Sequence, residues 1–289
     1  MGGIEVRFKL AEDDKKPIGV YFKEQKEANK LIEEFMLLAN KSVAKLLSSN
    51  SRTNVFRVHD TPNMEKLTAL SNVCRTFGHE FKLEGESEDL KKSINELLRD
   101  VKGTPEENMI STIVTRCMSK ATYTIQNIGH YGLGFTHYSH FTSPIRRYPD
   151  LITHRLLFDF LNKKNQGNPN IIEDQAKWCS ERELVASKAQ RDSIKYMQVK
   201  YMENHKDQQF EGVISGVTEW GIYVEIIENK CEGMVRIRDI KGDFYRFDAE
   251  EFALIGERTK TKYQLGDEVE VRVKQADLVK KHLDFILNS

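Results

Sequence analysis

The sequence predicts an α+β protein in which an α-rich body precedes a small β-barrel. Up to residue 207, apolar side chains recur at the three- and four-residue spacing of amphipathic helices. From Phe210 onwards the period becomes two, because Val and Ile alternate with charged residues, and seven glycines punctuate the strands. We therefore place a boundary near Gln208, with residues 1–207 as the first domain and residues 208–289 as the second.

The composition of the chain limits its class. With 289 residues, 39% of them apolar and 30% charged, the chain is long enough to bury a sizeable core and too mixed in composition to be disordered. No apolar run approaches the roughly 20 residues that span a bilayer, and the first residues lack the pattern of a secretion signal. We expect a soluble, cytoplasmic protein that makes no membrane contact.

Charge and cysteine content narrow the class further. Lys plus Arg equals Asp plus Glu, at 44 each, so the net charge alone does not indicate a nucleic-acid partner. It does not exclude one, since affinity for RNA depends on the phosphates neutralised along one track. The four cysteines are scattered without a C-x-x-C pair, which argues against a disulfide framework and a thiolate zinc site. We expect them to be small buried apolar residues.

Turn and capping residues, together with apolar spacing, predict the elements of the body. An alternating start, interrupted by the polar residues 12–17, predicts a hairpin over residues 4–22. Residues 28–47 carry an apolar stripe wide enough to face the core. Proline in the first turn and glycine after the last turn mark the ends of other helices. The later helices are expected over residues 62–77, 90–101, 104–117, 151–161 and 171–204.

The segment between residues 129 and 150 has the most distinctive chemistry. It is rich in Gly, His and aromatic residues, and Arg146 and Arg147 stand between two prolines, directly before a predicted helix. Arginine binds phosphate bidentately, hydroxyls complete the phosphate shell, and a helix N-terminus favours an anion. Aromatic rings offer stacking faces for bases. This chemistry indicates a phosphate-and-base site, although a solvated arginine pair beside core aromatics would give the same pattern.

The same segment resembles a known family. Residues 140–151, His-Phe-Thr-Ser-Pro-Ile-Arg-Arg-Tyr-Pro-Asp-Leu, followed by His154 and Arg155, resemble the signature of the RNB catalytic domain of the ribonuclease R and ribonuclease II family. Residues 31–40 and 56–62 resemble upstream blocks of that domain, so the likeness extends over essentially the whole chain. The spacing around residues 147–150 favours ribonuclease R over ribonuclease II.

The resemblance implies a function and a set of site residues. It implies a processive 3'-to-5' exoribonuclease that hydrolyses single-stranded RNA to nucleoside 5'-monophosphates with the help of two metal ions, Mg²⁺ in the full-length enzyme. Arg146 would be catalytic and would stabilise charge on the reacting phosphoryl group. Either of the neighbouring Glu33 and Glu34 would contact the terminal ribose, and the sequence leaves open which one. The other implied RNA-binding residues of the body are Tyr138, His140, Ser143, Arg147 and Tyr148.

The chain departs from the family in its acidic residues. Metal-assisted hydrolysis needs several converging carboxylates, which the family supplies as an aspartate cluster N-terminal to the region seen here. Residues 12–14 are the only dense early acidic run, and their Lys-Lys-Pro flank predicts a hairpin turn. We therefore expect this chain to bind no metal, to be inactive alone, and to lack an N-terminal region of the same enzyme. A rival hypothesis is a histidine metal site at His137 and His140, with His130 and His154 nearby.

The second domain resembles the S1-type RNA-binding OB fold, a five-stranded barrel. Residues 210–225 form paired strands around glycine bends, and residues 233–237, 245–247 and 265–273 match later strands of that barrel. Such a barrel binds single strands by stacking and by basic side chains, although core packing is the alternative for each aromatic residue. The expected RNA-binding residues are Phe210, Trp220, Tyr223, Arg236, Tyr245 and Arg246. A non-catalytic RNA-binding module, or a helical interaction protein with an accessory barrel, remain the alternatives to an exoribonuclease.

Overall fold

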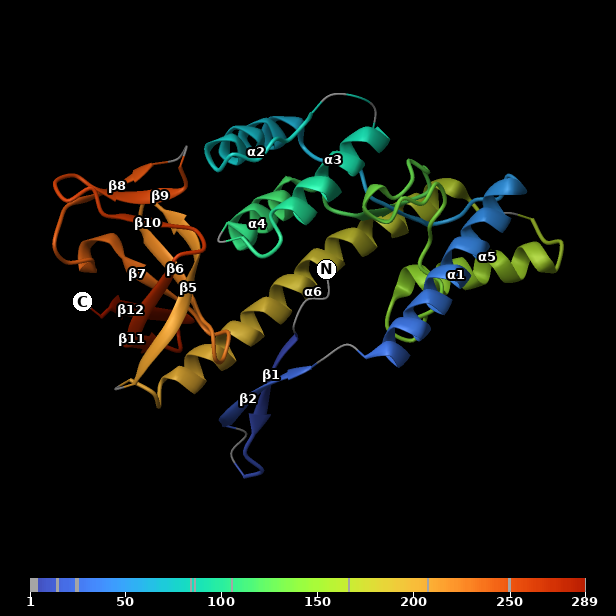
Figure 1. The fold of residues 1–289 in the computed structure, drawn as a ribbon. Helices are drawn as coiled ribbons and strands as arrows, with labels where there is room; N and C mark the ends of the chain where they lie inside the picture. Colours follow the sequence, from blue (N-terminus) through green and yellow to red (C-terminus); the bar gives the residue numbers. More distant parts are fainter. Residues whose placement is uncertain are drawn as a thin grey trace. The chain divides into compact units, whose positions relative to one another are not determined.

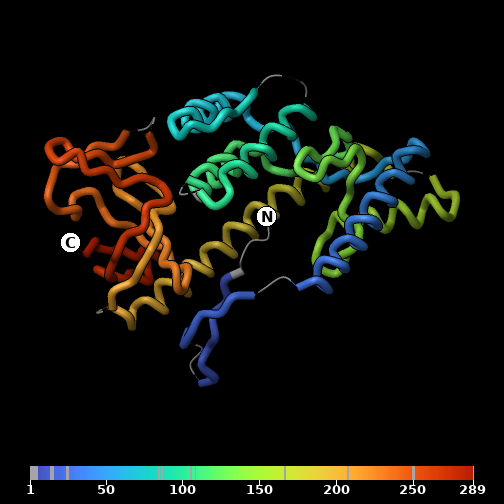
Figure 2. Tube along the Cα trace, viewed as in Figure 1, coloured from blue at the N-terminus to red at the C-terminus, as the bar shows by residue number. Residues whose placement is uncertain are grey.

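A computed structural model describes residues 5–13, 16–23, 26–83, 85, 87–104, 106–165, 167–206, 208–248 and 251–288. The chain divides into two compact units (Figures 1 and 2). Residues 1–24, 63–117 and 190–289 form the first, which we call the barrel unit, and residues 25–62 and 118–189 form the second, which we call the loop unit.

The barrel unit is built around a closed five-stranded barrel. Its strands follow the order β11-β12-β7-β6-β5, and all neighbours are antiparallel except β12 and β7. Alternate residues of these strands are buried, which is the period of two seen in the sequence. The strands are β5 (Gln209–Thr218), β6 (Gly221–Ile226), β7 (Glu232–Arg236), β11 (Glu268–Asp277) and β12 (His282–Leu287).

A second sheet stands beside the barrel and was not predicted. Strands β8 (Tyr245–Asp248), β9 (Ala253–Gly256) and β10 (Lys262–Gln264) pair only with one another, in the order β10-β9-β8. The prediction that residues 245–247 form a barrel strand is therefore wrong. These strands have three or four residues each, so the sequence shows too few alternations to separate them from the barrel.

The remaining elements of the barrel unit are a hairpin and helices. The predicted hairpin is formed by β1 (Glu5–Leu10) and β2 (Pro17–Lys23). Three helices pack through buried Leu and Ile side chains, and the end of α6 (Pro169–Met202) also belongs to this unit. The three helices are α2 (Met64–Thr76), α3 (Ser87–Asp100) and α4 (Glu107–Cys117).

The loop unit combines helices with a two-stranded sheet. Strands β3 (Phe56–Val58) and β4 (Thr122–Thr124) pair antiparallel beside α1 (Glu27–Ser49), α5 (Tyr148–Leu161) and the start of α6. A short 3-10 turn, η1 (Tyr131–Leu133), interrupts the long connection between β4 and α5. The buried cluster of this unit consists of Val55, Tyr123, Ile152, Ile172, Ala176 and Cys179.

Helix α1 corrects one expectation. Its predicted core-facing stripe is buried only in the C-terminal half, at Asn40, Ala44 and Leu47. Leu31 and Phe35, in the N-terminal half, are 58% and 60% exposed. The apolar spacing correctly predicted the helix, but spacing does not tell which neighbour covers a face.

The predicted fold class, an α-rich body followed by a five-stranded barrel, is confirmed. All four cysteines are free and buried, as expected. Within the residues described above, no helix is long and apolar enough to cross a membrane.

Candidate phosphate-binding site

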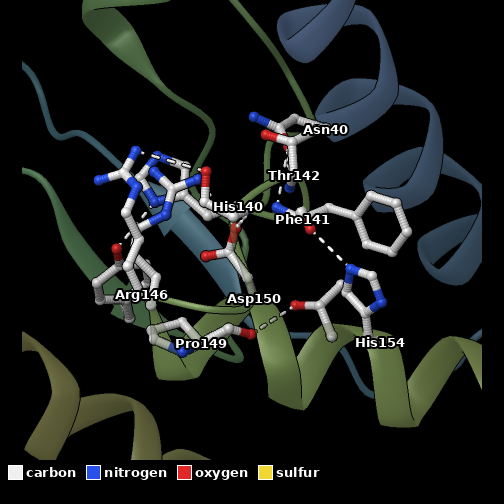
Figure 3. Close-up of polar contacts among 12 residues, drawn as sticks. Asn40, His140, Phe141, Thr142, Arg146, Pro149, Asp150 and His154 are labelled. Atoms are coloured by element: carbon white, nitrogen blue, oxygen red, sulfur yellow. Dashed lines mark hydrogen bonds and ion pairs between the residues drawn. The ribbon is translucent and has the colours of Figure 1, made fainter.

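The turn that carries Arg146 and Arg147 is fixed by a buried carboxylate. Asp150 lies in the first turn of α5 and is 0% exposed. Its Oδ2 accepts hydrogen bonds from the backbone N–H of Ser143 at 2.8 Å and from the Arg147 guanidinium at 2.9 Å (Figure 3). The Ser143 carbonyl accepts from the N–H groups of both arginines, at 3.3 and 3.0 Å. Residues 143–147 therefore form a closed turn on the N-terminus of α5.

The segment before this turn is held by Asn40 of α1. The Asn40 Oδ1 accepts from the N–H groups of Phe141 and Thr142 at 2.9 and 3.2 Å (Figure 3). Its Nδ2 donates to the Tyr138 hydroxyl at 3.2 Å. From the other side, His154 of α5 hydrogen-bonds the Phe141 carbonyl at 2.8 Å and stacks on the Phe141 ring. Two helices thus fix the backbone that leads to the arginines.

A second buried network lies beside the first. Arg57 pairs with both carboxylate oxygens of Glu183, at 2.6 and 3.2 Å, and its guanidinium lies 4.5 Å from the centre of the Tyr123 ring. The Tyr123 hydroxyl is 2.8 Å from Nδ1 of His140. Asn54 adds a hydrogen bond to the Ser139 hydroxyl at 2.7 Å. This network orients the residues that precede the turn.

The charges of the site leave Arg146 as the arginine directed to solvent. Asp150 neutralises Arg147, and Glu183 neutralises Arg57. Arg146 is exposed, and its guanidinium makes one long contact, 3.4 Å, to the Ser143 hydroxyl. The neighbouring Ile145 is fully exposed, so the turn projects from the unit. A guanidinium held in this way can present its planar fork to a phosphate.

Two histidines of the segment, His130 and His140, add no positive charge at neutral pH. Burial, with Arg147 and Arg57 nearby, lowers the pKa of His140 to about 3. Burial and His59 lower the pKa of His130 to about 4. Burial likewise raises the pKa of the Tyr123 hydroxyl to about 12, which keeps that group neutral. The positive potential of the site therefore comes from arginine, which does not titrate in the physiological range.

The described residues do not form a metal centre. In the described part of the chain, no group of three or more His, Cys, Asp or Glu side chains is arranged to hold a metal ion. The histidines of the rival hypothesis use ring nitrogens for protein contacts instead: His130 with Leu133, His137 with Thr136, His140 with Tyr123, and His154 with Phe141. Glu12 and Asp13 are exposed in the β1–β2 turn, and Asp14 lies outside the described residues.

Apart from His140, which contacts Tyr123 as described above, the predicted site residues of the body fall into three groups. Ser143, Arg147 and Tyr148 lie together with Arg146 on the turn, and Tyr148 is 40% exposed. Tyr138 is buried, so its ring offers no open face to a base. Glu33 and Glu34 are both exposed on the N-terminal half of α1, and the contact of one of them with the terminal ribose stays a prediction.

The predicted RNA-binding residues of the barrel unit differ in exposure and in their partners. Trp220 is 68% exposed, whereas Phe210 is buried and serves the barrel core. Arg236 pairs with Asp284 at 2.8 Å. Tyr223 and Tyr245 are half-buried, and the Tyr245 ring lies 5.5 Å from that of Tyr263. Arg246 is exposed. Their contacts with RNA stay predictions.

Sequence reasoning missed the residues that hold the site. Asn40, Asn54, Arg57 and Glu183 were given no role, and Asp150 was seen only as part of the motif. The one signal available was local: an aspartate three residues after an arginine, in the first turn of a helix, can pair with that arginine. The other partners are 85 to 126 residues apart in the chain, beyond any local pattern.

Comparison with known proteins agrees with this fold. The RNB domain model matches residues 3–163, and the S1 RNA binding domain model matches residues 203–287. The chain belongs to the RNB domain family, and the resemblance predicted from residues 140–151 is confirmed.

Three similar proteins carry the name ribonuclease R or RNase R. The chain is 35% identical to ribonuclease R of Aquifex aeolicus over 281 residues, which cover 96% of this chain and 40% of the relative. It is 36% identical to ribonuclease R of Escherichia coli K12 over 278 residues, covering 92% and 34%. The structure of Mycoplasma genitalium RNase R in complex with ribose methylated single-stranded RNA superimposes with a TM-score of 0.87 at 27% identity, covering 99% of this chain and 45% of that chain. The chain thus spans between a third and a half of these proteins.

Proposed function

We propose that this chain forms the phosphate-binding and RNA-binding part of a ribonuclease R-like 3'-to-5' exoribonuclease that releases nucleoside 5'-monophosphates. On its own, the chain binds single-stranded RNA without hydrolysing it. The observation that carries this proposal is the exposed Arg146 on a turn that Asp150 and Asn40 hold rigid. The RNB and S1 matches, and the relative solved with single-stranded RNA, support it.

The turn supplies groups that suit a phosphodiester. The Arg146 fork and the Ser143 hydroxyl lie next to each other, so both can donate to non-bridging phosphate oxygens. Donors fixed before the substrate arrives stabilise developing negative charge without a cost of reorganisation. In the complete enzyme, Arg146 would therefore be the catalytic arginine of this chain, with Arg147 and Tyr148 positioning the strand.

The hydrolytic step needs carboxylates that the described residues do not bring together. We propose that they come from an N-terminal region of the same enzyme, with Mg²⁺ as the ion they hold. The shorter span of this chain than of its relatives supports that proposal. So does the N-terminal half of α1, where four large apolar side chains are each 58–60% exposed: Leu31, Ile32, Phe35 and Leu38. We call these four residues the α1 stripe.

An exposed apolar stripe of this kind marks a surface that another part of a protein covers. The isolated chain is therefore expected to bind the hydrophobic dye 1-anilinonaphthalene-8-sulfonate. The double variant Leu31→Glu with Phe35→Glu keeps strong helix formers in α1 and should lose most of the dye fluorescence. Val279→Glu, at a 93% exposed position of the barrel unit, is the matched control. Equal fluorescence from the stripe variant and the wild type would contradict this role of α1.

The function is tested by binding and by shortening of a 5'-labelled single-stranded RNA, with and without Mg²⁺. The wild-type chain should bind and leave the RNA intact. Arg146→Ala should weaken binding about tenfold, the effect of losing a charged hydrogen-bonding group, and should lower the slope of log K against log salt by about 0.7. Arg99→Ala, an exposed arginine at the end of α3, is the control and should bind as the wild type does.

Each other outcome has a definite meaning. Shortening of the RNA by the wild type, lost in Arg146→Ala, would show that the chain gathers metal ligands of its own. Binding without any response to Arg146→Ala would favour a non-catalytic RNA-binding module. Absence of binding would contradict the proposal and favour a helical interaction protein.

A further inference from the structure

The barrel unit leaves few aromatic rings free for a base. Phe210 is buried, and a Cβ added at Gly216 would lie 3.4 Å from the Tyr223 ring, so that ring already covers the glycine. Within the described residues 209–287, the aromatic side chains most open to solvent are Phe244, at 76%, and Trp220, at 68%. Phe244 was not among the predicted RNA-binding residues.

Phe244 is exposed because a rigid turn holds it there. The carboxylate of the preceding Asp243 is 0% exposed and accepts four hydrogen bonds shorter than 3 Å. The donors are the N–H groups of Phe244 at 2.7 Å, Arg258 at 2.9 Å and Thr259 at 2.6 Å, and the Thr259 hydroxyl at 2.8 Å. The Phe244 carbonyl in turn accepts from the N–H of Glu257 at 2.8 Å. The turn before β8 is thereby tied to the turn after β9.

Two glycines show how tightly this turn is packed. A Cβ at Gly256 would come within 2.7 Å of the Asp243 carboxylate, so a larger residue there would displace it. Gly242 has a φ of +98°, a conformation that other residues rarely adopt. The same hydrogen bonds keep the pKa of Asp243 well below its ordinary range, so the turn stays intact at neutral and mildly acidic pH. The benzyl side chain is therefore presented to solvent from a preorganised position.

The surroundings of Phe244 are basic although the whole chain is neutral. Residues 241–246 and 256–262 contain five Lys or Arg residues against two carboxylates, and one of these two is the enclosed Asp243. Arg258 lies against the turn: its Nε is 3.5 Å from the Asp243 carboxylate and a terminal guanidinium nitrogen is 3.4 Å from the Gly242 carbonyl, but its side chain is 75% exposed and can still reach a phosphate. Lys262 is engaged with Glu251 at 2.7 Å, whereas Lys241, Arg246 and Lys260 are exposed.

An exposed ring among cations is the arrangement that binds a single-stranded nucleic acid: the ring stacks on a base and the cations neutralise the adjoining phosphates. A rigid platform loses little conformational entropy on binding. Among the described residues, none places an aromatic ring against Phe244, and the 76% exposure of its side chain leaves ring surface open to a base.

We propose that Phe244, with Lys241 and Arg258, forms a base-stacking subsite for single-stranded RNA at the β8–β10 sheet, outside the strands of the barrel. In Figure 1 this sheet stands beside the barrel as a separate layer of the same unit. The subsite rests on the proposed function, because it deepens the contact of this chain with RNA. It provides one stacking position and two phosphate positions.

The test is fluorescence anisotropy of a labelled oligouridylate of about 12 nucleotides, within the roughly 4–16 that one OB fold covers. It uses the full chain in EDTA. Phe244→Ala should raise Kd at least about fivefold, the smaller end of a stacking contribution, without changing the salt slope, since no charge is removed. Phe244→Tyr should bind as the wild type does. Lys241→Ala should lower the salt slope by about 0.7.

Val279→Ala, at an exposed apolar position of the β11–β12 turn, is the matched control and should leave Kd unchanged. If the wild type binds and Phe244→Ala stays within twofold of it, the subsite is refuted while the proposed function stands, and the ring serves another occupant such as a protein. If Phe244→Tyr loses as much affinity as Phe244→Ala, stacking is refuted. If the wild type does not bind RNA at all, the proposed function itself fails.

Discussion

Replacement of Asp150 by Ala is expected to destabilise the loop unit by about 3–5 kcal/mol, the range for removing one partner of a buried ion pair. The substitution would leave the half-buried Arg147 guanidinium and the Ser143 N–H without their acceptor. Both groups would lose a hydrogen bond in a place that water does not readily reach. The turn that presents Arg146 should then lose its fixed conformation, and RNA affinity should fall with it.

The stability of the loop unit can be measured separately from that of the barrel unit. It has two tryptophans, Trp178 in the loop unit and Trp220 in the barrel unit. In a Trp220→Phe background, urea unfolding followed by tryptophan fluorescence therefore reports the loop unit alone. Asp150→Asn is the matched comparison, because its amide oxygen can still accept from Ser143 but carries no charge for Arg147. It should lose about half as much stability as Asp150→Ala.

A loss below about 1 kcal/mol for Asp150→Ala would mean that solvent replaces the carboxylate at little cost, as at a surface ion pair. The turn would then owe its shape to its own backbone. In that case Arg146 would be positioned by the bound RNA and would not be preorganised.

The site shows which parts of the protein could be predicted from its sequence. The candidate phosphate-binding residues could be found, because Ser143, Arg146 and Arg147 stand together in a motif, and a phosphate needs donors of this kind. The helices could be found as well, since their apolar residues recur with the period of the helix. Helix α5 begins at Tyr148 and not at the predicted residue 151, because Pro149 is well accommodated in the first helical turn.

The supporting residues could not be found in the same way. Asn40 hydrogen-bonds Tyr138 across 98 residues of chain, and Arg57 pairs with Glu183 across 126. A lone Asn or Glu on a helix resembles any solvated residue until the partner is known. The α1 stripe was placed in the core for the opposite reason: apolar spacing is a local property, whereas burial depends on what packs against it.

Replacement of Asn40 is expected to cause the second large loss of stability, because its Oδ1 accepts hydrogen bonds from two consecutive backbone N–H groups. Asn40→Leu keeps a similar volume but provides no acceptor, so the N–H groups of Phe141 and Thr142 are left without a partner beside α1. Each unsatisfied donor costs about 1–3 kcal/mol, so we expect the loop unit to lose about 2–6 kcal/mol in total. Asn40→Asp keeps the acceptor, loses only the donor to Tyr138, and should lose less.

Hydrogen exchange separates this role from a general loss of packing. In Asn40→Leu, the amide protons of Phe141 and Thr142 should exchange at least about tenfold faster, which corresponds to about 1.4 kcal/mol, while in Asn40→Asp they should stay protected. Asn170→Leu, an exposed position near the start of α6 in the same unit, is the control and should leave both amides unchanged. Protection that survives in Asn40→Leu would show that α5, through His154, holds the segment alone. The arginine turn would then be anchored from one helix rather than two, and α1 would have no part in positioning it.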